Sequence, residues 1–311
     1  MKLHEDKDSF RVLLNDIGSK VKIRTDILEK DYYITLMLEE LSRHQDERKA
    51  YFKGGTALYK ALHCINRFSE DIDLTVFVDD CKSETAKQKK LHKSVDSYTC
   101  LTISSCIKSM KGSAIAEYSY ESIFGFTVDD LQRFGKVKVE ATSFTVSEPR
   151  QKVQISPIIF EKANDDQKNI LIDRFAVMPF NIESIKLERI FVDKIFAAEY
   201  YFQRARYLDA AKHIYDLIIL FENDRIQEFL ADPSLLSEML GYIRLEEKVR
   251  LGGISSELLI RNFRYLKDAL INNDLEVEYN RMQRIYIFSD HDQRPLSMAE
   301  GVFAAISRIK E

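Results

Sequence analysis

The sequence is poor in the residues that make turns. Its 311 residues include only 10 glycines and 5 prolines, alongside many leucines, isoleucines, lysines and glutamates. This composition argues against a sandwich or barrel built from many tight turns, and it favours helices. An apolar share of 45% is ample for a buried core. We therefore expect a helix-rich protein that folds on its own.

Cysteine is also scarce. The four cysteines show no CxxC pairing and have no histidines at zinc-finger spacing; they are Cys64, Cys81, Cys100 and Cys106. The pattern predicts neither a structural zinc site nor a disulfide framework, and it is typical of free thiols in a reducing cytosol.

Long apolar runs and excess charge of one sign are missing as well. No run of about 18 apolar residues occurs, and the start MKLHEDKDSF is charged where a signal peptide needs an apolar core. We expect a cytoplasmic protein without a membrane segment. The net charge of −4 argues against a general nucleic-acid coat. A basic patch on one face of the protein could still bind nucleic acid. The best candidate is a lysine-rich helix with Lys87, Lys89, Lys90 and Lys93, although these lysines are also typical of a solvated helix surface.

Two of the few glycines are adjacent, in the stretch KGGTALYKALHCINRFSEDIDLTV over residues 53–76. Apolar spacing predicts a helix from Thr56 to about Cys64. Glycines let a backbone come close to a ligand, and the unpaired N–H groups at a helix start attract an anion such as a phosphate. Gly54 and Gly55 therefore suit a phosphate-binding turn.

The run SEDIDLTVFV alternates between polar and apolar residues, which predicts a strand. Asp71 and Asp73 then share one face, and Ile72 and Leu74 the other. Paired carboxylates can hold one or two hard cations, and Mg²⁺ prefers a few carboxylates together with phosphate oxygens. Each feature alone is common on surfaces, but the two together indicate nucleotide chemistry.

The rest of the chain changes character near residue 180. A helix is expected over about residues 19–43, and strands around IFGFTV, KVKVEATSF and KVQISPIIF suggest a small antiparallel or mixed sheet. Beyond Asn181 the pattern is almost uninterrupted helix, and Pro179 marks the break. We predict an α/β or α+β domain at 1–180, a helical domain at 181–311, and an active site in the cleft between them.

KGGTALYKAL followed by RFSEDIDL resembles the signature of the AbiEii/AbiGii-type nucleotidyltransferases, a branch of the polymerase β-like superfamily that includes toxins of toxin–antitoxin and abortive-infection systems. The matching positions are Gly54, Gly55, Thr56, Asp71 and Asp73. The segment EKD at 29–31 and the helical stretches VDKIFAA and KHIYDLIIL are similar to further family motifs. The resemblance covers about residues 25–222 and implies a polymerase β-like core with a mixed sheet, followed by a helical C-terminal domain.

The resemblance also implies a set of site residues. Asp71, Asp73 and Glu140 would bind Mg²⁺, although Glu140 is equally compatible with an ordinary polar residue of an alternating strand. The turn from Gly54 to Thr56 would hold the triphosphate together with Lys194.

Lys194 and Asp216 also have an independent argument. Lys194 lies on the apolar stripe of its helix, so it needs an anion, which is either a buried acid such as Glu29 or the triphosphate. Asp216 is an acid within an apolar helix and needs a partner. His213 stands where many relatives have Asp, which leaves the role of that motif open. Lys212 and Arg67 are lesser candidates.

The implied reaction is transfer of a nucleoside monophosphate from an NTP to an acceptor hydroxyl. By family, the acceptor is an RNA 3′ end such as that of a tRNA, the role is growth arrest or phage defence, and a separately encoded antitoxin restrains the protein. Two alternatives are left open: nucleotidylation of a protein or small molecule, and a nucleotide-binding regulator without turnover.

Overall fold

The structure is a computed structural model that describes residues 1–105, 108–110, 112–125, 133–250 and 252–311. The chain divides into two compact units. The first comprises Met1–Leu62, Phe68–Ser143 and Arg150–Ser184, and the second comprises His63–Arg67, Phe144–Pro149 and Ile185–Glu311. Among the described residues, no helix combines the length and apolar character that a membrane span requires.

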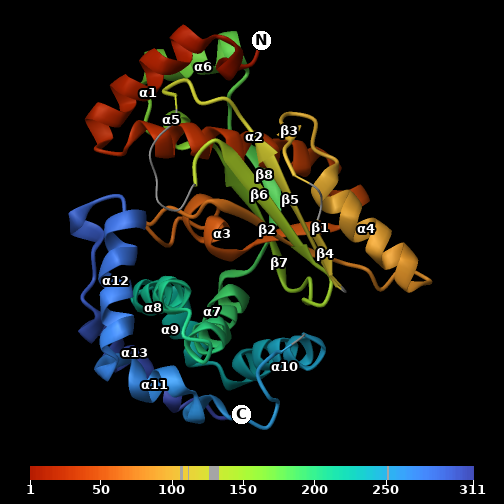
Figure 1. The fold of residues 1–311 in the computed structure, drawn as a ribbon, viewed down its shortest axis with the longest axis vertical. Helices are drawn as coiled ribbons and strands as arrows, with labels where there is room; N and C mark the ends of the chain where they lie inside the picture. The colour runs from red at the N-terminus through yellow and green to blue at the C-terminus, as the bar shows by residue number, and fades with distance from the viewer. Residues whose placement is uncertain (106–107, 111, 126–132, 251) are drawn as a thin grey trace. The chain divides into compact units, whose positions relative to one another are not determined.

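The first unit is built on a mixed sheet, whose eight described strands run in the order β3-β5-β6-β2-β1-β8-β7, with β4 paired to β5 (Figure 1). Parallel pairing joins β2 to β6 and β1 to β8, whereas β1–β2 and β5–β6 are antiparallel. The strands are β1 (Ala50–Lys53), β2 (Asp71–Val76), β3 (Thr102–Ile103), β4 (Lys108–Met110), β5 (Ser113–Ser119), β6 (Lys136–Thr142), β7 (Arg150–Ile155) and β8 (Phe180–Ile185).

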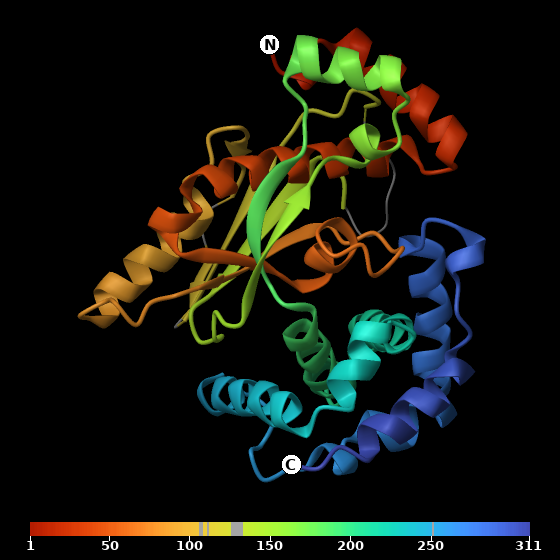
Figure 2. The ribbon, with the colours of Figure 1, turned by 180° about the vertical axis from the view of Figure 1, so that it is seen from behind.

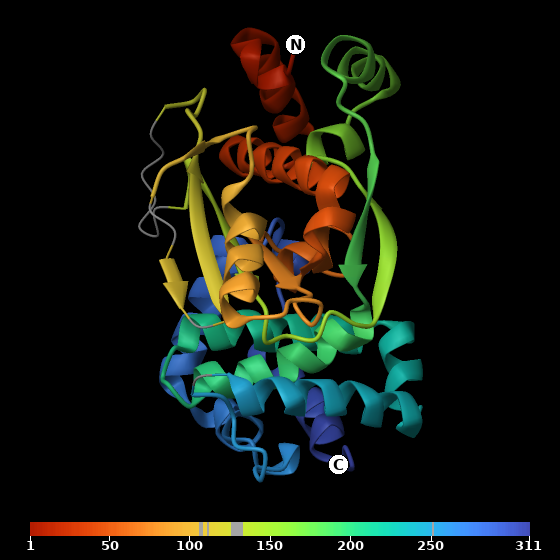
Figure 3. The same cartoon turned by 90° about the vertical axis from the view of Figure 1, so that its right-hand side faces the viewer.

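Helices α2 and α4 pack against the sheet and against each other (Figure 3). Helix α2 is buried along most of its length, polar residues included, so the EKD segment lies inside the unit. The helices of this unit are α1 (Lys7–Val21), α2 (Thr25–Arg48), α3 (Gly54–Lys60), α4 (Glu84–Asp96), α5 (Ile158–Glu161) and α6 (Asp165–Phe175), and a 3-10 turn, η1, covers Leu3–Glu5.

The second unit is helical in its described part. Helix α8 is its centre, because α7 and α12 both pack along it (Figures 1 and 2). The helices are α7 (Leu187–Phe202), α8 (Tyr207–Phe221), α9 (Asp224–Leu230), α10 (Pro233–Val249), α11 (Arg264–Asp268), α12 (Asn273–Tyr286) and α13 (Ala299–Ser307). Four 3-10 turns complete it: η2 (Ile260–Asn262), η3 (Ala269–Ile271), η4 (Asp290–Asp292) and η5 (Leu296–Met298).

The predicted fold class, a mixed-sheet α/β core followed by helices, is confirmed. Some element boundaries were wrong. The helix expected over residues 19–43 is two helices, because Lys22 adopts a left-handed conformation (φ 60°) between α1 and α2. Helix α3 begins at Gly54 and ends at Lys60, earlier at both ends than expected.

The strand predictions were mixed. Strand β2 and the strand in KVKVEATSF, which is β6, were correct, but in KVQISPIIF the strand ends at Ile155 and helix α5 follows. The strand expected at IFGFTV is a turn over residues 123–124, and residues 126–128 lie outside the described part of the chain. Strands β1, β3, β4, β5 and β8 were not predicted.

Candidate active site

Three carboxylates lie on one face of two neighbouring parallel strands. In β2, Ile72 and Leu74 are fully buried, whereas Asp71 and Asp73 are only partly buried on the opposite face. Strand β6 runs parallel to β2, and its register places Glu140 directly beside Asp73. The predicted alternation of β2 is therefore confirmed, and the sheet brings Glu140 to the two aspartates from 67 positions further along the chain.

The environment of this face raises the pKa of Asp73. Burial is the largest effect, and the neighbouring charges of Glu140 and Asp71 add to it, so that the pKa of Asp73 rises to about 6. Carboxylates placed this way repel one another, and a cation would relieve the repulsion.

The donor chemistry of this face fits a hard cation such as Mg²⁺, because all three groups are carboxylates. Within the described ranges, however, no three Asp, Glu, His or Cys side chains converge closely enough to hold a metal ion. A lysine stands among the acids instead: the Nζ atom of Lys138 is 2.9 Å from Oδ2 of Asp71 and 3.6 Å from Oε2 of Glu140.

The glycine turn supports Asp73 directly. Gly54 has φ +79°, and a Cβ atom placed on it would lie 2.2 Å from Oδ2 of Asp73. Only glycine fits this position, both for its backbone conformation and for the space. The hydroxyl of Thr56, two residues on, donates a hydrogen bond to the main-chain carbonyl of Asp71, and Gly55 is buried. The turn therefore fixes both aspartates of β2.

A second cluster lies within the helical unit and centres on Asp216. Its carboxylate is fully buried, and Arg67 binds it through two bonds, Nε–Oδ1 at 2.6 Å and Nη2–Oδ2 at 2.7 Å. The Nζ atom of Lys194 is 2.8 Å from Oδ2. Burial would raise the pKa of Asp216, but the charges of Arg67 and Lys194 outweigh burial and hold it well below its usual range.

The structure settles which buried acid contacts Lys194. It is Asp216, and the suggestion of Glu29 was wrong. The Glu29 carboxylate accepts hydrogen bonds from Oγ of Ser122 (2.6 Å) and from the main-chain N–H of Ile123 (2.8 Å), and burial raises its pKa. Arg67, a lesser candidate from sequence, is a main member of the cluster because its guanidinium forms the bidentate pair with Asp216.

His213 lies beside this cluster. Its ring stacks on Tyr201 with centroids 5.3 Å apart, and its buried Nδ1 atom has no hydrogen-bond partner among the described residues. Burial, followed by the charge of Lys194, lowers the pKa of His213 well below its usual value, so the ring is neutral at pH 7. The adjacent Lys212 pairs with Asp209 at 3.6 Å and lies 4.5 Å from the ring centroid of Tyr286.

The EKD segment contributes a buried network that holds α3. Asp31 pairs with Nζ of Lys60 at 2.7 Å, accepts a hydrogen bond from the Tyr59 hydroxyl at 2.9 Å, and accepts another from the N–H of Ile158 at 2.7 Å. The Asp31 and Lys60 side chains are both fully buried. Lys30 in turn pairs with Glu70 at 3.3 Å, next to the start of β2. Neither Lys60 nor Lys138 was predicted as a site residue, although the alternation of KVKVE puts Lys138 on the same face as Glu140.

The lysine-rich helix α4 is less basic than its sequence indicates. Three of its four lysines form ion pairs with acids, Lys87 with Glu84, Lys90 with Asp80 and Lys93 with Glu47. These acids cancel most of the charge of the expected basic face. Cys64, Cys81 and Cys100 form no disulfide among the described residues, and Cys106 lies outside them.

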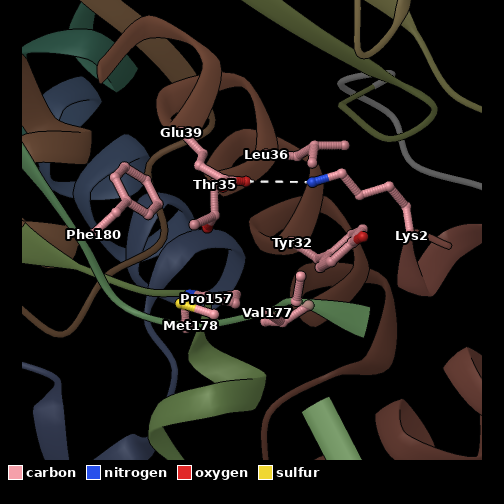
Figure 4. Close-up of a pocket in the computed structure, with 10 residues that line it drawn as sticks. Lys2, Tyr32, Thr35, Leu36, Glu39, Pro157, Val177, Met178 and Phe180 are labelled. Atoms are coloured by element: carbon pink, nitrogen blue, oxygen red, sulfur yellow. Dashed lines mark ion pairs between the residues drawn. The ribbon is translucent and has the colours of Figure 1, made fainter. Parts of the chain in front are cut away.

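The first unit also contains a small cavity (Figure 4). Its volume is about 20 Å³, which is room for about one water molecule. Its wall includes apolar side chains and the ion pair of Lys2 with Glu39 at 3.6 Å. The cavity is too small for a nucleotide, and none of the candidate site residues lines it.

A family model and a solved structure are similar to this chain. A family model described as "Nucleotidyl transferase AbiEii toxin, Type IV TA system" matches residues 36–302. A solved structure, MenT4, a nucleotidyltransferase toxin from Mycobacterium tuberculosis, is similar at 15% identity with a TM-score of 0.48, over 96% of this chain and 90% of that one. No curated protein matches the sequence.

Proposed function

Because the chain belongs to the AbiEii family, the nucleotidyltransferase toxins of type IV toxin–antitoxin systems, we propose that it uses Mg²⁺ to transfer a nucleoside monophosphate from an NTP to the 3′ end of an RNA, such as a tRNA. Family membership also implies a cognate antitoxin. We propose further that residues 1–180 form the nucleotidyltransferase domain and residues 181–311 a helical domain.

The register of β2 and β6 carries this proposal, because it sets Glu140 beside Asp73 on the face that also holds Asp71. We assign these three carboxylates to Mg²⁺, which would neutralise charge on the transferred phosphoryl group when bound. Gly54 and Thr56 hold the aspartates in place, and the pKa of Asp73 is raised first by burial and then by the charges of Glu140 and Asp71.

Lys194 is assigned to the triphosphate. Arg67 and Lys194 together carry two positive charges against the single negative charge of Asp216. A buried cluster with one surplus positive charge favours an anion. In this proposal Asp216 orients Lys194 when no nucleotide is bound. The turn from Gly54 to Thr56, in the first unit, is our other candidate for phosphate contact.

An RNA acceptor is supported by basic and aromatic side chains where α7 ends. The Tyr200 ring lies between two guanidinium groups, with Arg204 at 3.7 Å and Arg250 at 3.8 Å from its centroid. Arg206 lies 4.7 Å from the centroid of the neighbouring Tyr201. Stacked guanidinium and aromatic planes suit unpaired bases and phosphates. Arg206 and Arg250 pair with acids of their own, Asp209 at 2.6 Å and Glu247 at 3.1 Å, so Arg204 is the residue through which this cluster is tested as the candidate RNA contact.

The proposal is tested by incubating the protein with each labelled NTP, Mg²⁺ and total cellular RNA. We expect label on small RNA, and none with Asp73→Asn. Label on protein would support the alternative acceptor, and tight NTP binding without any transfer would support a regulator. Reversing the charge with Arg204→Glu should lower the rate of transfer to RNA and make that rate less dependent on salt, whereas NTP affinity should be unchanged.

A matched control for Arg204→Glu is Arg264→Glu. Arg264 is also an exposed arginine of the helical unit, but its only described ion pair is a long one of 3.9 Å with Asp268 in the same helix. If both variants reduce transfer equally, general surface charge is responsible, and the cluster at the end of α7 is not the RNA contact.

A further inference from the structure

Lys138 stands where a metal ion of the carboxylate cluster would be expected. It is two residues before Glu140 in β6, so the two side chains share a face, and the register of β2 and β6 places it directly beside Asp71. Its ammonium contacts both Asp71 (2.9 Å) and Glu140 (3.6 Å), and all three side chains are about one third exposed. The ammonium therefore occupies a cation position between two of the three acids.

Charge balance limits how many further cations this face can accept. Without nucleotide, the three carboxylates carry three negative charges, and two lysines oppose them: Lys138, and Lys53, which β1 places beside Asp73 and whose charge lowers the pKa of Asp73. One divalent ion therefore already offsets the remaining negative charge, whereas a second one would add to a positive surplus and would have to approach the Lys138 ammonium within a few ångströms. An ion and an ammonium that share the same oxygen atoms compete for them.

We propose that Lys138 is a built-in cation that takes one of the two metal positions of the cluster, so that the protein binds a single divalent ion between its carboxylates and the triphosphate. The inference rests on the proposed function, because it requires Asp73 and Glu140 to be metal ligands. It makes Lys138 a positioning residue that contacts both Asp71 and Glu140 and leaves their remaining oxygens to one ion.

Lys136 provides the matched control. It lies on β6 two residues before Lys138, so its side chain is on the same face. Its ammonium pairs with Glu117 of β5 at 3.8 Å. It contacts neither aspartate of β2 in the described structure. Lys136→Met therefore removes the same charge from the same strand without opening a cation position in the cluster.

The test counts bound Mn²⁺ by electron paramagnetic resonance in the presence of a non-hydrolysable NTP analogue. We expect one ion for the wild-type protein, one for Lys136→Met, and two for Lys138→Met, with a spin–spin interaction between the two ions. Without nucleotide, Lys138→Met should bind Mn²⁺ at least about 10-fold more tightly than the wild type, because the competing ammonium is gone. Lys138→Gln is measured in parallel, and circular dichroism checks that each variant is folded.

Two ions in the wild-type protein, both sensitive to Asp73→Asn, would overturn the inference and leave the proposed function intact. A single ion in Lys138→Met and Lys138→Gln would also overturn it. If Asp73→Asn leaves Mn²⁺ binding unchanged in every variant, the carboxylates are not metal ligands, and the proposed function fails together with the inference.

Discussion

The carboxylate of Asp73 lies directly against Gly54, leaving no room for a side chain: a Cβ atom on residue 54 would be 2.2 Å from Oδ2 of Asp73. We expect Gly54→Ala to displace Asp73 and to lower nucleotidyl transfer by about 100-fold or more, because small displacements of reacting groups have effects of this size. Steady-state transfer assays measure the loss.

Gly125→Ala separates this clash from backbone strain. Gly125 has the same φ of +79°, but a Cβ atom there would meet nothing within 4 Å. Both variants should lose about 1 kcal/mol of stability from the left-handed conformation, whereas only Gly54→Ala should lose activity. Equal activity in the two variants would contradict the role that we assign to Gly54.

Asp73 should make stability depend on pH. Its pKa is about 6 in the folded protein, above the ordinary value of 3.8, so the folded state binds the extra proton. Stability from this group is fully present below about pH 4 and is lost as pH rises through 6. Asp73→Asn should therefore raise the melting temperature at pH 7.5 by about 2–4 °C, corresponding to about 1 kcal/mol after allowance for partial exposure, and by nothing at pH 4.

Mg²⁺ provides a second measurement on the same pair of proteins. Adding Mg²⁺ at pH 7.5 should stabilise the wild type and leave Asp73→Asn unchanged, because the ion relieves the repulsion that the substitution removes. Lower stability of Asp73→Asn without Mg²⁺ at pH 7.5 would mean that Asp73 is a structural residue.

Removing Lys194 from the Asp216 cluster should affect NTP affinity more than stability. Lys194→Met leaves the bidentate pair of Arg67 with Asp216 intact and keeps the apolar stem, so stability should change by less than about 1 kcal/mol. NTP affinity, measured by calorimetry, should fall by about 10- to 100-fold, as for the loss of a charged hydrogen bond. Unchanged affinity would remove Lys194 from the site.

Asp216→Asn, in contrast to Lys194→Met, should strongly reduce stability. It leaves two cations side by side in a buried environment, with only a neutral amide between them. We expect a loss of about 3–5 kcal/mol in the free energy of unfolding, measured by urea denaturation. A loss as small as that of Lys194→Met would show that water reaches the cluster and screens it.

Asp31 should act through structure alone. Asp31→Ala leaves Lys60 buried without its carboxylate and should destabilise the protein by about 3–5 kcal/mol. Asp31→Leu combined with Lys60→Met should recover part of this loss, because it removes both buried charges. Asp16→Ala, which breaks the exposed pair of Asp16 with Lys20, should change stability far less, because water screens that pair. Denaturant midpoints compare the three variants.

Local patterns in the sequence were sufficient for β2, the helical character of the second half and the family. Alternation with a period of two placed Asp71 and Asp73 on one face of β2, since adjacent side chains of a strand point to opposite sides. The apolar stripe of α7 likewise predicted that Lys194 is buried and needs an anion. Both inferences depend only on residues within a few positions of one another.

Contacts between distant segments were decided by the tertiary structure alone. The register of β2 against β6 sets Lys138 beside Asp71, and packing brings Arg67 to Asp216 from 149 positions away. The sequence carried the charges of helix α4, but only the fold showed that Asp80 and Glu47 neutralise Lys90 and Lys93. A local pattern determines which face a side chain occupies, whereas strand register and helix packing, which depend on the whole core, determine which charge it meets there.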